Sequence, residues 1–470
     1  MSHPMRRALR AGFVLCILAV GAASARAQDT LSTAMRTGID SIVGDVLAAT
    51  ATPSASIAIV SHGRITYARA FGQARLDPKT PAAPDMRYSI GSISKQFAAT
   101  AVLLLAEQGK LSLDDKVGRW LPELTRANGV SLRQLLSMTS GYQDYWPQDY
   151  VMPGMLLPTT PRQIVDTWAR KPLDFDPGTK WQYSNTNYVI AGMIVEQVSG
   201  MPLVQFLQKE IFAPLGMRSV AIIDEGPLGP GDPQGYRRFA LGPPRPAPKE
   251  GKGWLFAAGE LAMTAHDLAL WDLSVINQRI LDRRFYRMQQ KTTLLADGVA
   301  TDYGLGVHVG MVNGHRVISH SGEVSGFTAQ NTIYPDDAAA VVVLTNLDAT
   351  SAPGVIAARI GSRLFAATDS ATQQATAQVR SIFEGLQHHR IDRTLFSANA
   401  NAYFSDQALA DYASSLGPLG GPAAVQQVTQ RLRGGMTYRA FRVRCDKATV
   451  FVTTFILPDG KFEQFQVEGG

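Results

Sequence analysis

Two residues suited to covalent chemistry, Ser92 and Lys95, lie three positions apart in the chain's only Ser-x-x-Lys string. The apolar run at 97–106 predicts a helix that begins near Ile93, which would place both side chains on one face, one turn apart. A serine hydroxyl becomes a nucleophile when a neighbouring group removes its proton. A lysine can do this if burial lowers its pKa. On its own, the string also fits a helix-capping serine followed by an exposed lysine.

A second string, Tyr183-Ser184-Asn185, is the only Tyr-x-Asn in the chain. It precedes a helix predicted over 186–198. A tyrosine beside a cationic lysine loses its proton more easily and can act as a base. An asparagine offers both a donor and an acceptor, so it can orient a lysine and a substrate carbonyl. The alternative is a core aromatic followed by a helix cap.

A third string is His320-Ser321-Gly322, predicted to lie at the end of a strand that begins near Arg316. A glycine there would let a substrate approach the backbone, and the following N–H could donate to an oxyanion. His308 begins a similar triplet. We prefer His320 because a Gly/Ser-rich turn is predicted over 321–327, whereas the alternation around His308 indicates a structural strand residue.

In this order the strings resemble the penicillin-recognising serine hydrolases, the superfamily of class C β-lactamases, DD-peptidases and related esterases. Supporting likeness comes from RYSIGS at 87–92, LLSMTSG at 135–141 and AAGEL at 257–261. The likeness covers residues 30–365. It implies acyl transfer in two steps through an ester on a serine, without metal or cofactor.

The resemblance also assigns a role to each matching residue. The catalytic residues would be Ser92, Lys95 and Tyr183; the substrate-orienting residues Asn185, His320, Ser321 and Gly322; and the oxyanion donors the backbone N–H groups of Ser92 and Glu323. Tyr183 would act as partner base and later as acid. Either Lys95 or Tyr183 could take the first proton.

His320 departs from the family pattern in a way that bears on substrate. Relatives that bind a β-lactam or peptide carboxylate often carry a permanent cation on this strand, whereas a histidine is mostly neutral at pH 7. Efficient β-lactam hydrolysis is therefore disfavoured. Small esters, D-amino-acid peptides and β-lactam-like substrates stay open, and Ser321 keeps a hydroxyl that could hold a carboxylate. The alternative is a non-catalytic protein that binds or senses cell-wall peptides.

The predicted elements define the fold class as α/β, more narrowly α+β and β-lactamase-like. Strands are predicted at 56–60 and 64–71, and again at 303–312, 316–319, 328–334 and 339–344. The region between them is mostly helical, with a long surface excursion at 224–253. We therefore expect one antiparallel sheet, flanked by helices at 28–47 and 352–365, with an inserted α-helical subdomain.

The chain divides into four parts. Residues 1–27 form a secretory signal, with a basic start, an apolar run and a small-residue cleavage site. Residues 28–365 form the hydrolase domain, 366–377 a linker, and 378–470 a small α+β accessory domain. The accessory domain looks similar to nuclear transport factor 2, with helices followed by strands and a hairpin turn at 457–460.

Composition limits the partners and the compartment. The 470 residues are 45% hydrophobic and 18% charged, which suits a sizeable core. The net charge of +6 falls to +2 without residues 1–27, and nothing indicates nucleic-acid binding. Only Cys445 remains after cleavage, so no internal disulfide or cysteine metal site is expected. We expect an exported protein, periplasmic or secreted, without a membrane anchor, that binds a small-molecule or peptide acyl substrate.

Overall fold

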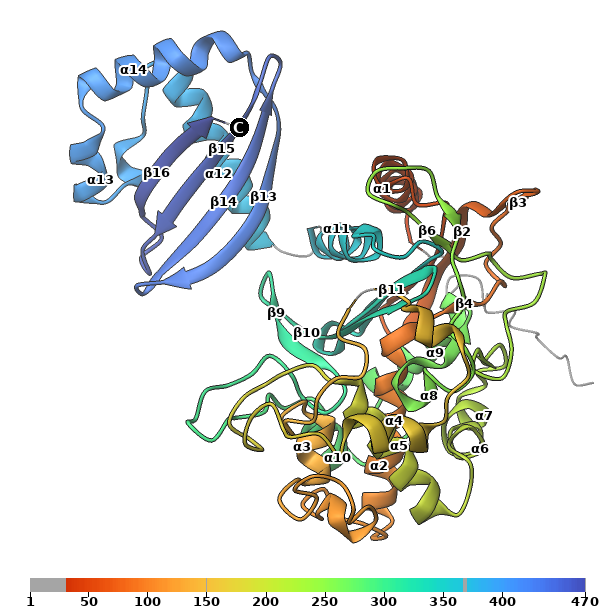
Figure 1. Ribbon diagram of the computed structural model, residues 1–470. Coiled ribbons are helices and arrows are strands. Elements are labelled where there is room, and N and C mark those ends of the chain that lie inside the picture. Colours follow the sequence, from red (N-terminus) through yellow and green to blue (C-terminus); the bar gives the residue numbers. More distant parts are fainter. Residues whose placement is uncertain (1–30, 149, 367–369, 470) are drawn as a thin grey trace, which may run out of the picture.

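The computed structural model describes residues 31–148, 150–366 and 370–469, which form two bodies (Figure 1). The predicted signal segment lies outside the described residues. Within these ranges no single helix is long and apolar enough to cross a membrane. One pair of segments, Asn185–Ser199 with Leu203–Leu215, passes that test of length and composition together, with a bend of 72° between them.

The larger body is built on a seven-stranded antiparallel sheet with the order β3-β2-β1-β12-β11-β10-β9. β1 (Ser54–Ser61) pairs with β12 (Ala339–Thr345), so early and late parts of the chain meet at the sheet centre. Every residue of these two strands is buried, because helices cover both faces. The other strands are β2 (Arg64–Leu76), β3 (Lys79–Pro81), β9 (His308–Val312), β10 (His315–Val324) and β11 (Phe327–Tyr334). The predicted sheet of early and late strands is confirmed.

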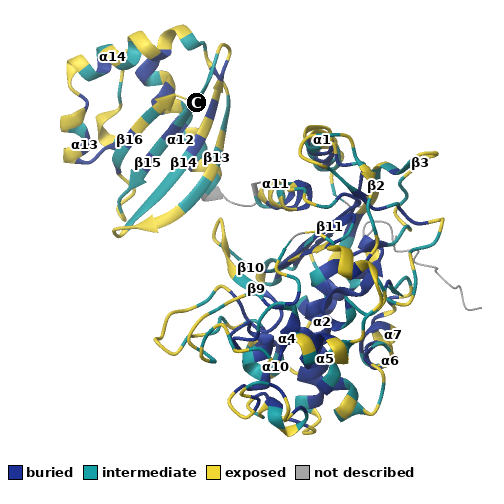
Figure 2. Ribbon diagram, in the orientation of Figure 1, coloured by how far each residue is buried: buried dark blue, intermediate teal, exposed yellow. Residues whose placement is uncertain are grey.

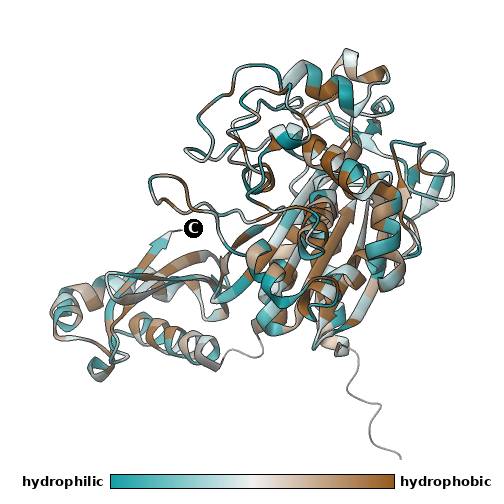
Figure 3. Ribbon diagram, turned by 90° about the horizontal axis from the view of Figure 1, so that it is seen from below, coloured by the Kyte–Doolittle hydropathy of each residue, from teal (hydrophilic) through white to brown (hydrophobic). Residues whose placement is uncertain are grey.

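The two terminal helices of this body pack on one face of the sheet, as predicted (Figure 1). They are α1 (Thr33–Thr50) and α11 (Ala352–Ala366), and their apolar side chains share a core with β1 and β12. The opposite face packs against the helices of the inserted segment. Figure 3 shows the hydrophobic strands between these layers.

The inserted segment between β3 and β9 is mostly helical, which confirms the expected subdomain. Its helices are α2 (Ser94–Glu107), α3 (Leu132–Leu136), α4 (Pro161–Trp168), α5 (Asn185–Ser199), α6 (Leu203–Leu207), α7 (Ala213–Leu215), α8 (Phe256–Gly259), α9 (Ala265–Ile276) and α10 (Arg283–Gln289). Its short strands are β4 (Tyr88–Ser89), β5 (Ala221–Ile222), β6 (Tyr236–Arg237), β7 (Arg245–Pro246) and β8 (Leu261–Met263).

Helix α2 runs through the centre of the larger body, with every residue from Ser94 to Leu105 buried (Figure 2). A buried polar chain fixes it. The Trp271 indole donates to Gln96 Oε1 (3.0 Å), the Gln96 amide donates to Asn331 Oδ1 (3.0 Å), and the Asn331 amide donates to Asp272 Oδ1 (2.7 Å). These bonds tie α2 to α9 and to β11. Buried hydrogen-bonded networks of this kind specify one packing arrangement.

The smaller body begins with α12 (Ser370–Gln387), so the predicted linker at 366–377 is wrong from residue 370 onward. Ala375, Val379, Ile382 and Phe383 recur at helical spacing and lie in the core of this body. The Ala- and Gln-rich composition that suggested a linker also has good helix propensity. These residues form a helix rather than a linker because the helical repeat of apolar residues begins at Ala375 and continues through the residues that follow.

The rest of the smaller body confirms an α+β domain. α13 (Ala398–Tyr403) and α14 (Asp406–Leu416) precede an antiparallel sheet with the order β13-β14-β15-β16. The strands are β13 (Pro422–Arg433), β14 (Met436–Cys445), β15 (Thr449–Ile456) and β16 (Phe462–Gly469), of which β13 was not foreseen. The predicted hairpin turn at 457–460 is confirmed, with Gly460 at φ +86°. The resemblance to nuclear transport factor 2 stays a prediction.

We predict that Asp272→Asn raises the midpoint of thermal unfolding at pH 7. Complete burial raises the pKa of Asp272 well above its usual value, so the folded state keeps a proton that the unfolded chain releases above about pH 4. Each pH unit in that window lowers wild-type stability by about 1.4 kcal/mol. The gain in the variant should shrink toward pH 4, measured by thermal melts across pH.

The exposed Asp297→Asn variant is the control, and its melting curve should follow the wild type at each pH. A midpoint for Asp272→Asn equal to or below the wild type at pH 7 would contradict the prediction.

Candidate active site

Ser92 lies in the short 3-10 turn Gly91–Ile93 that leads into α2, and Lys95 lies in the first turn of that helix. The Lys95 ammonium donates to Ser92 Oγ at 2.9 Å. Gly91 has φ +51°, a left-handed conformation that glycine adopts without strain. The predicted contact between the two side chains is therefore confirmed.

Lys95 is completely buried, and three oxygen atoms surround its Nζ. Besides Ser92 Oγ, these are Asn185 Oδ1 (2.7 Å) and the Ala258 carbonyl (2.8 Å). Burial disfavours the charged form and lowers the pKa of Lys95 to about 7, although the nearby Asp144 carboxylate opposes this shift. Lys95 can therefore hold or release a proton near neutral pH, which general-base catalysis requires.

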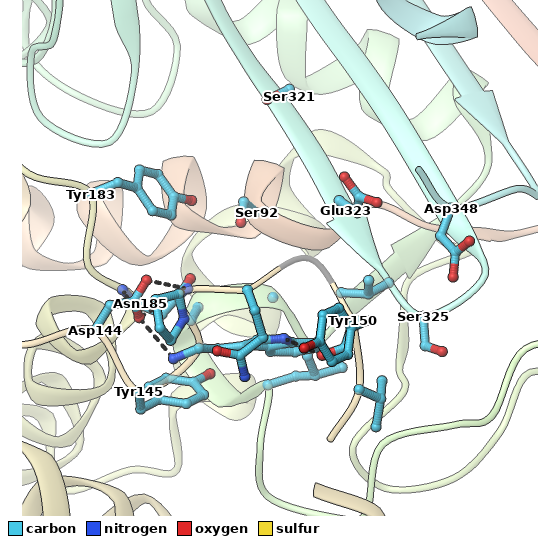
Figure 4. Close-up of a pocket in the computed structure, with 18 of the residues that line it drawn as sticks. Ser92, Asp144, Tyr145, Tyr150, Tyr183, Asn185, Ser321, Glu323, Ser325 and Asp348 are labelled. Atoms are coloured by element: carbon cyan, nitrogen blue, oxygen red, sulfur yellow. Dashed lines mark hydrogen bonds between the residues drawn. The ribbon is translucent and has the colours of Figure 1, made fainter. Parts of the chain in front are cut away.

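Tyr183 lies beside both groups. Its ring centroid is 5.0 Å from Lys95 Nζ, and its hydroxyl is turned toward Ser92 (Figure 4). Burial raises the pKa of Tyr183 well above its usual value, so its phenol stays protonated at neutral pH. Of the two candidate bases, Lys95 is the one able to take the Ser92 proton, and Tyr183 is placed to pass a proton on.

Asn185 starts α5 and is held by Asp144, a residue that the sequence analysis missed. Asp144 Oδ1 accepts from the backbone N–H of Asn185 (3.0 Å) and from its Nδ2 (3.2 Å). A carboxylate only accepts, so it turns the amide nitrogen to itself and leaves Asn185 Oδ1 facing Lys95. The one sequence signal for Asp144 was its place just after the LLSMTSG string.

His320 is buried, and both of its ring nitrogens are hydrogen-bonded within the protein. Nδ1 lies 2.6 Å from the Ser321 carbonyl, and Nε2 lies 2.9 Å from the Tyr303 hydroxyl. A carbonyl can only accept, so Nδ1 carries the proton and Nε2 accepts from Tyr303. Burial first, and then the charge of Lys95, lowers the pKa of His320 to about 3. His320 is therefore a neutral wall of the site, as expected, and supplies no cation for a substrate carboxylate.

The sequence predicted that Gly322 lets a substrate approach the backbone, but in the structure it lets another part of the protein backbone approach. A Cβ at this position would lie 1.9 Å from the Ile90 carbonyl and 3.3 Å from the Ser92 nitrogen. The nucleophile turn, rather than a substrate, therefore approaches Gly322. β10 also continues to Val324, so the turn predicted over 321–327 begins later.

The two predicted oxyanion donors lie in adjoining segments. A Cβ on Gly91 would come within 2.7 Å of the Glu323 nitrogen, so the turn that carries Ser92 packs directly on Glu323. Backbone N–H groups fixed this way need no reorganisation when charge develops on a substrate oxygen. The geometry suits the oxyanion role that the resemblance implied for Ser92 and Glu323.

Ser92, Tyr183, Asn185, His320 and Glu323 line one cavity of about 560 Å³. This volume is within the range of small-molecule sites. Ser321, Glu323 and Ser325 form one wall together with Asp348 (Figure 4). The segment predicted as a surface excursion contributes Arg237 and Pro248 to the lining.

His308, the first residue of β9, also lines the cavity. Its interpretation as a structural strand residue stays a prediction. Its ring lies edge-on to Tyr303, with 4.7 Å between the centroids. Within the described ranges, no group of three or more His, Cys, Asp or Glu side chains could hold a metal ion. The expected absence of a cofactor stays a prediction.

The profile of the β-lactamase family matches residues 39–362, which is more than half of the chain. Penicillin-binding protein 4* of Bacillus subtilis is 28% identical over 302 residues, which cover 60% of this chain and 66% of that protein. A D-aminopeptidase of Brucella anthropi is 28% identical over 300 residues, covering 63% and 56%. The chain thus spans less than two thirds of the length of both curated relatives.

One solved structure has a fold similar to that of the larger body. The D-amino acid amidase from Ochrobactrum anthropi SV3, complexed with D-phenylalanine, is 26% identical with a TM-score of 0.62. The superposition covers 71% of this chain and all of that one. The two chains share the fold that carries the Ser92 site.

We predict that the rate of ester hydrolysis, followed as kcat/KM against pH, rises through about pH 7 as Lys95 loses its proton. In Asp144→Asn the rise should move to lower pH. The carboxylate favours the charged form of Lys95, so its loss lowers the pKa of the lysine further.

The plateau of Asp144→Asn should also fall, because the new side chain accepts through one oxygen instead of two and so holds the Asn185 amide less firmly. Asp297→Asn, which removes an exposed carboxylate, should leave both the plateau and the rise unchanged. A rise that stays in place in Asp144→Asn would show that Asp144 does not act on Lys95.

Proposed function

The chain belongs to the β-lactamase family of serine hydrolases, and on this premise we propose that it is an exported enzyme that cleaves amides or esters through an acyl-enzyme on Ser92. One observation carries the proposal. The buried Lys95, with a pKa of about 7, lies 2.9 Å from Ser92 Oγ. A serine with a poised base at hydrogen-bonding distance is the arrangement that nucleophilic catalysis requires.

The acylation step uses groups of this chain alone. Ser92 Oγ attacks the substrate carbonyl carbon while Lys95 Nζ takes the hydroxyl proton. The carbonyl oxygen becomes an oxyanion beside the backbone N–H groups of Ser92 and Glu323. The bond to the leaving amine or alcohol then breaks, and that group receives a proton through Tyr183, whose hydroxyl is turned toward Ser92 (Figure 4). The product of this step is an ester on Ser92.

Deacylation runs the same steps with water as the nucleophile. Lys95, again neutral, takes a proton from a water molecule that attacks the ester carbonyl, and Ser92 Oγ leaves and regains a proton. A carboxylic acid is released, and the free enzyme returns. Asn185 keeps Lys95 aligned in both steps because Asp144 fixes the orientation of the Asn185 amide.

For the substrate we propose small D-amino-acid amides, peptides or esters rather than β-lactams. The wall across from Tyr183 carries two carboxylates, Glu323 and Asp348 (Figure 4), and the described lining of the cavity has a single guanidinium, that of Arg237. The strand position where a cation would bind a substrate carboxylate holds the neutral His320. The names of the related D-aminopeptidase and D-amino acid amidase support the same class.

Export to the periplasm or medium is proposed from residues 1–27. N-terminal sequencing of protein secreted by its source organism should begin at Gln28. A protein whose N-terminal residue is Met1 would contradict this part of the proposal. The alternative, a non-catalytic protein that binds cell-wall peptides, keeps the fold but needs no reactive serine.

We predict that a fluorophosphonate probe labels the wild type on Ser92 at a stoichiometry near one, detected by mass spectrometry. Ser92→Ala should not be labelled, whereas the exposed Ser112→Ala should label like the wild type. Equal labelling of Ser92→Ala would refute the nucleophile. Absence of labelling in every variant would favour the non-catalytic alternative.

We predict that kcat/KM for p-nitrophenyl acetate and for D-phenylalanine p-nitroanilide exceeds that for the cephalosporin nitrocefin by at least about tenfold, or about 1.4 kcal/mol in the barrier. The reason is the missing strand cation at His320. The L-phenylalanine anilide serves as the stereochemical control and should react more slowly than the D form. Nitrocefin as the fastest substrate would restore a β-lactamase function.

A further inference from the structure

Among the residues that the structure describes, no helix packs on one face of the sheet in the smaller body. α12 crosses behind the strands in Figures 1 and 2, and no helix lies in front of them. Side chains alternate along each strand, so Phe441 and Val443 enter the core with α12. The residues between and beside them in β14, Arg442 and Arg444, point to the opposite, exposed side.

Four exposed arginines of this face define what we call the arginine face: Arg431, Arg433, Arg442 and Arg444. Register places them on the side away from α12, because Arg431 pairs with Tyr438 in β14 and Arg442 pairs with Phe451 in β15. Among the described residues of the four strands, Glu468 is the one acid that faces the same way. The face is therefore strongly positive.

Three of these guanidinium groups lie within cation–π distance of aromatic rings. The ring centroids lie 4.7 Å from Arg431 Cζ at Tyr438, 5.8 Å from Arg433 Cζ at Phe455, and 5.7 Å from Arg442 Cζ at Phe451. A neighbouring ring restricts the guanidinium, whose N–H donors can make paired bonds to a carboxylate or phosphate. The arginine face thus presents ordered anion-binding groups.

The spacing of the arginines calls for a long ligand. Arg433 lies opposite Met436, eight residues from Arg444 along β14, which is about 27 Å of strand. Arg431 lies opposite Tyr438, and from there to Arg442 is about 14 Å. A single phosphate or carboxylate spans neither distance, whereas a linear polyanion spans both.

The residues that lie between Arg431 and Arg433 on β13 and Arg442 and Arg444 on β14 favour a polymer that carries hydroxyl groups. Ala440, Thr453 and Gln466 form one row across the sheet, and they offer a hydroxyl and an amide. An arginine Cζ lies within about 6 Å of the centroid of each of the three rings, so the guanidinium groups compete with nucleobases for the ring faces. We propose that the arginine face binds an extended acidic polysaccharide, a function separate from hydrolysis at Ser92.

The test measures binding of fluorescein-labelled polygalacturonate to the full-length protein by fluorescence anisotropy. The wild type should bind, with affinity that falls steeply as salt rises, and neutral dextran should not compete. The double variant Arg442→Gln/Arg444→Gln should bind at least about tenfold more weakly. Its hydrolysis of a small ester should equal that of the wild type.

A matched control removes the same charge from elsewhere. Arg283→Gln/Arg287→Gln changes two exposed arginines of α10 in the larger body and should bind like the wild type. No binding by the wild type would overturn the proposal, as would equal loss in both double variants. Tighter binding of single-stranded DNA or of anionic lipid vesicles than of polygalacturonate would assign the face to that other class of partner and equally overturn it.

Discussion

The structure of the larger body depends on one buried ammonium group. Lys95 is removed from water, and a charge in that position is tolerated only if hydrogen-bond acceptors replace the lost solvent. Its three acceptors come from three places in the chain: Ser92 in the preceding turn, Asn185 at the start of α5, and the Ala258 carbonyl in α8. Burial lowers the pKa of Lys95, and the charge of Asp144 opposes that shift, so the pKa lies at about 7.

That constraint explains the supporting contacts around the site. Asp144 fixes which end of the Asn185 amide faces the lysine. The polar chain from Trp271 through Gln96 to Asp272 ties α2 to the sheet and to α9, so the helix that carries Lys95 cannot rotate without breaking buried hydrogen bonds. His320, kept neutral by burial and by the charge of Lys95, adds no second charge beside the ammonium. Each contact limits a movement that would leave the lysine without acceptors.

Local patterns predicted the parts of this arrangement that neighbouring residues determine. The spacing of Ser92 and Lys95 and the alternation of the strands follow from helix and strand periodicity. Asp144, Tyr303 and the Ala258 carbonyl were not foreseen, because their roles arise from contacts between segments distant in sequence. The first part of α12, residues 370–377, was assigned to a linker for another reason, since a composition typical of linkers outweighed a helical repeat that becomes apolar only from Ala375 onward.

The close contact at Gly322 has a consequence for how this protein can change over time. The turn that bears the nucleophile rests on the backbone of β10, with no side chain between them. Within this strand Ser321 and Glu323 are the exposed residues that line the cavity, whereas Gly322 is buried against the nucleophile turn. Side-chain substitutions at these two exposed positions can alter which acyl groups fit without displacing Ser92. The position of the nucleophile and the choice of substrate thus depend on different residues of one strand. Evolution can change the substrate through the exposed residues while Gly322 keeps Ser92 in place.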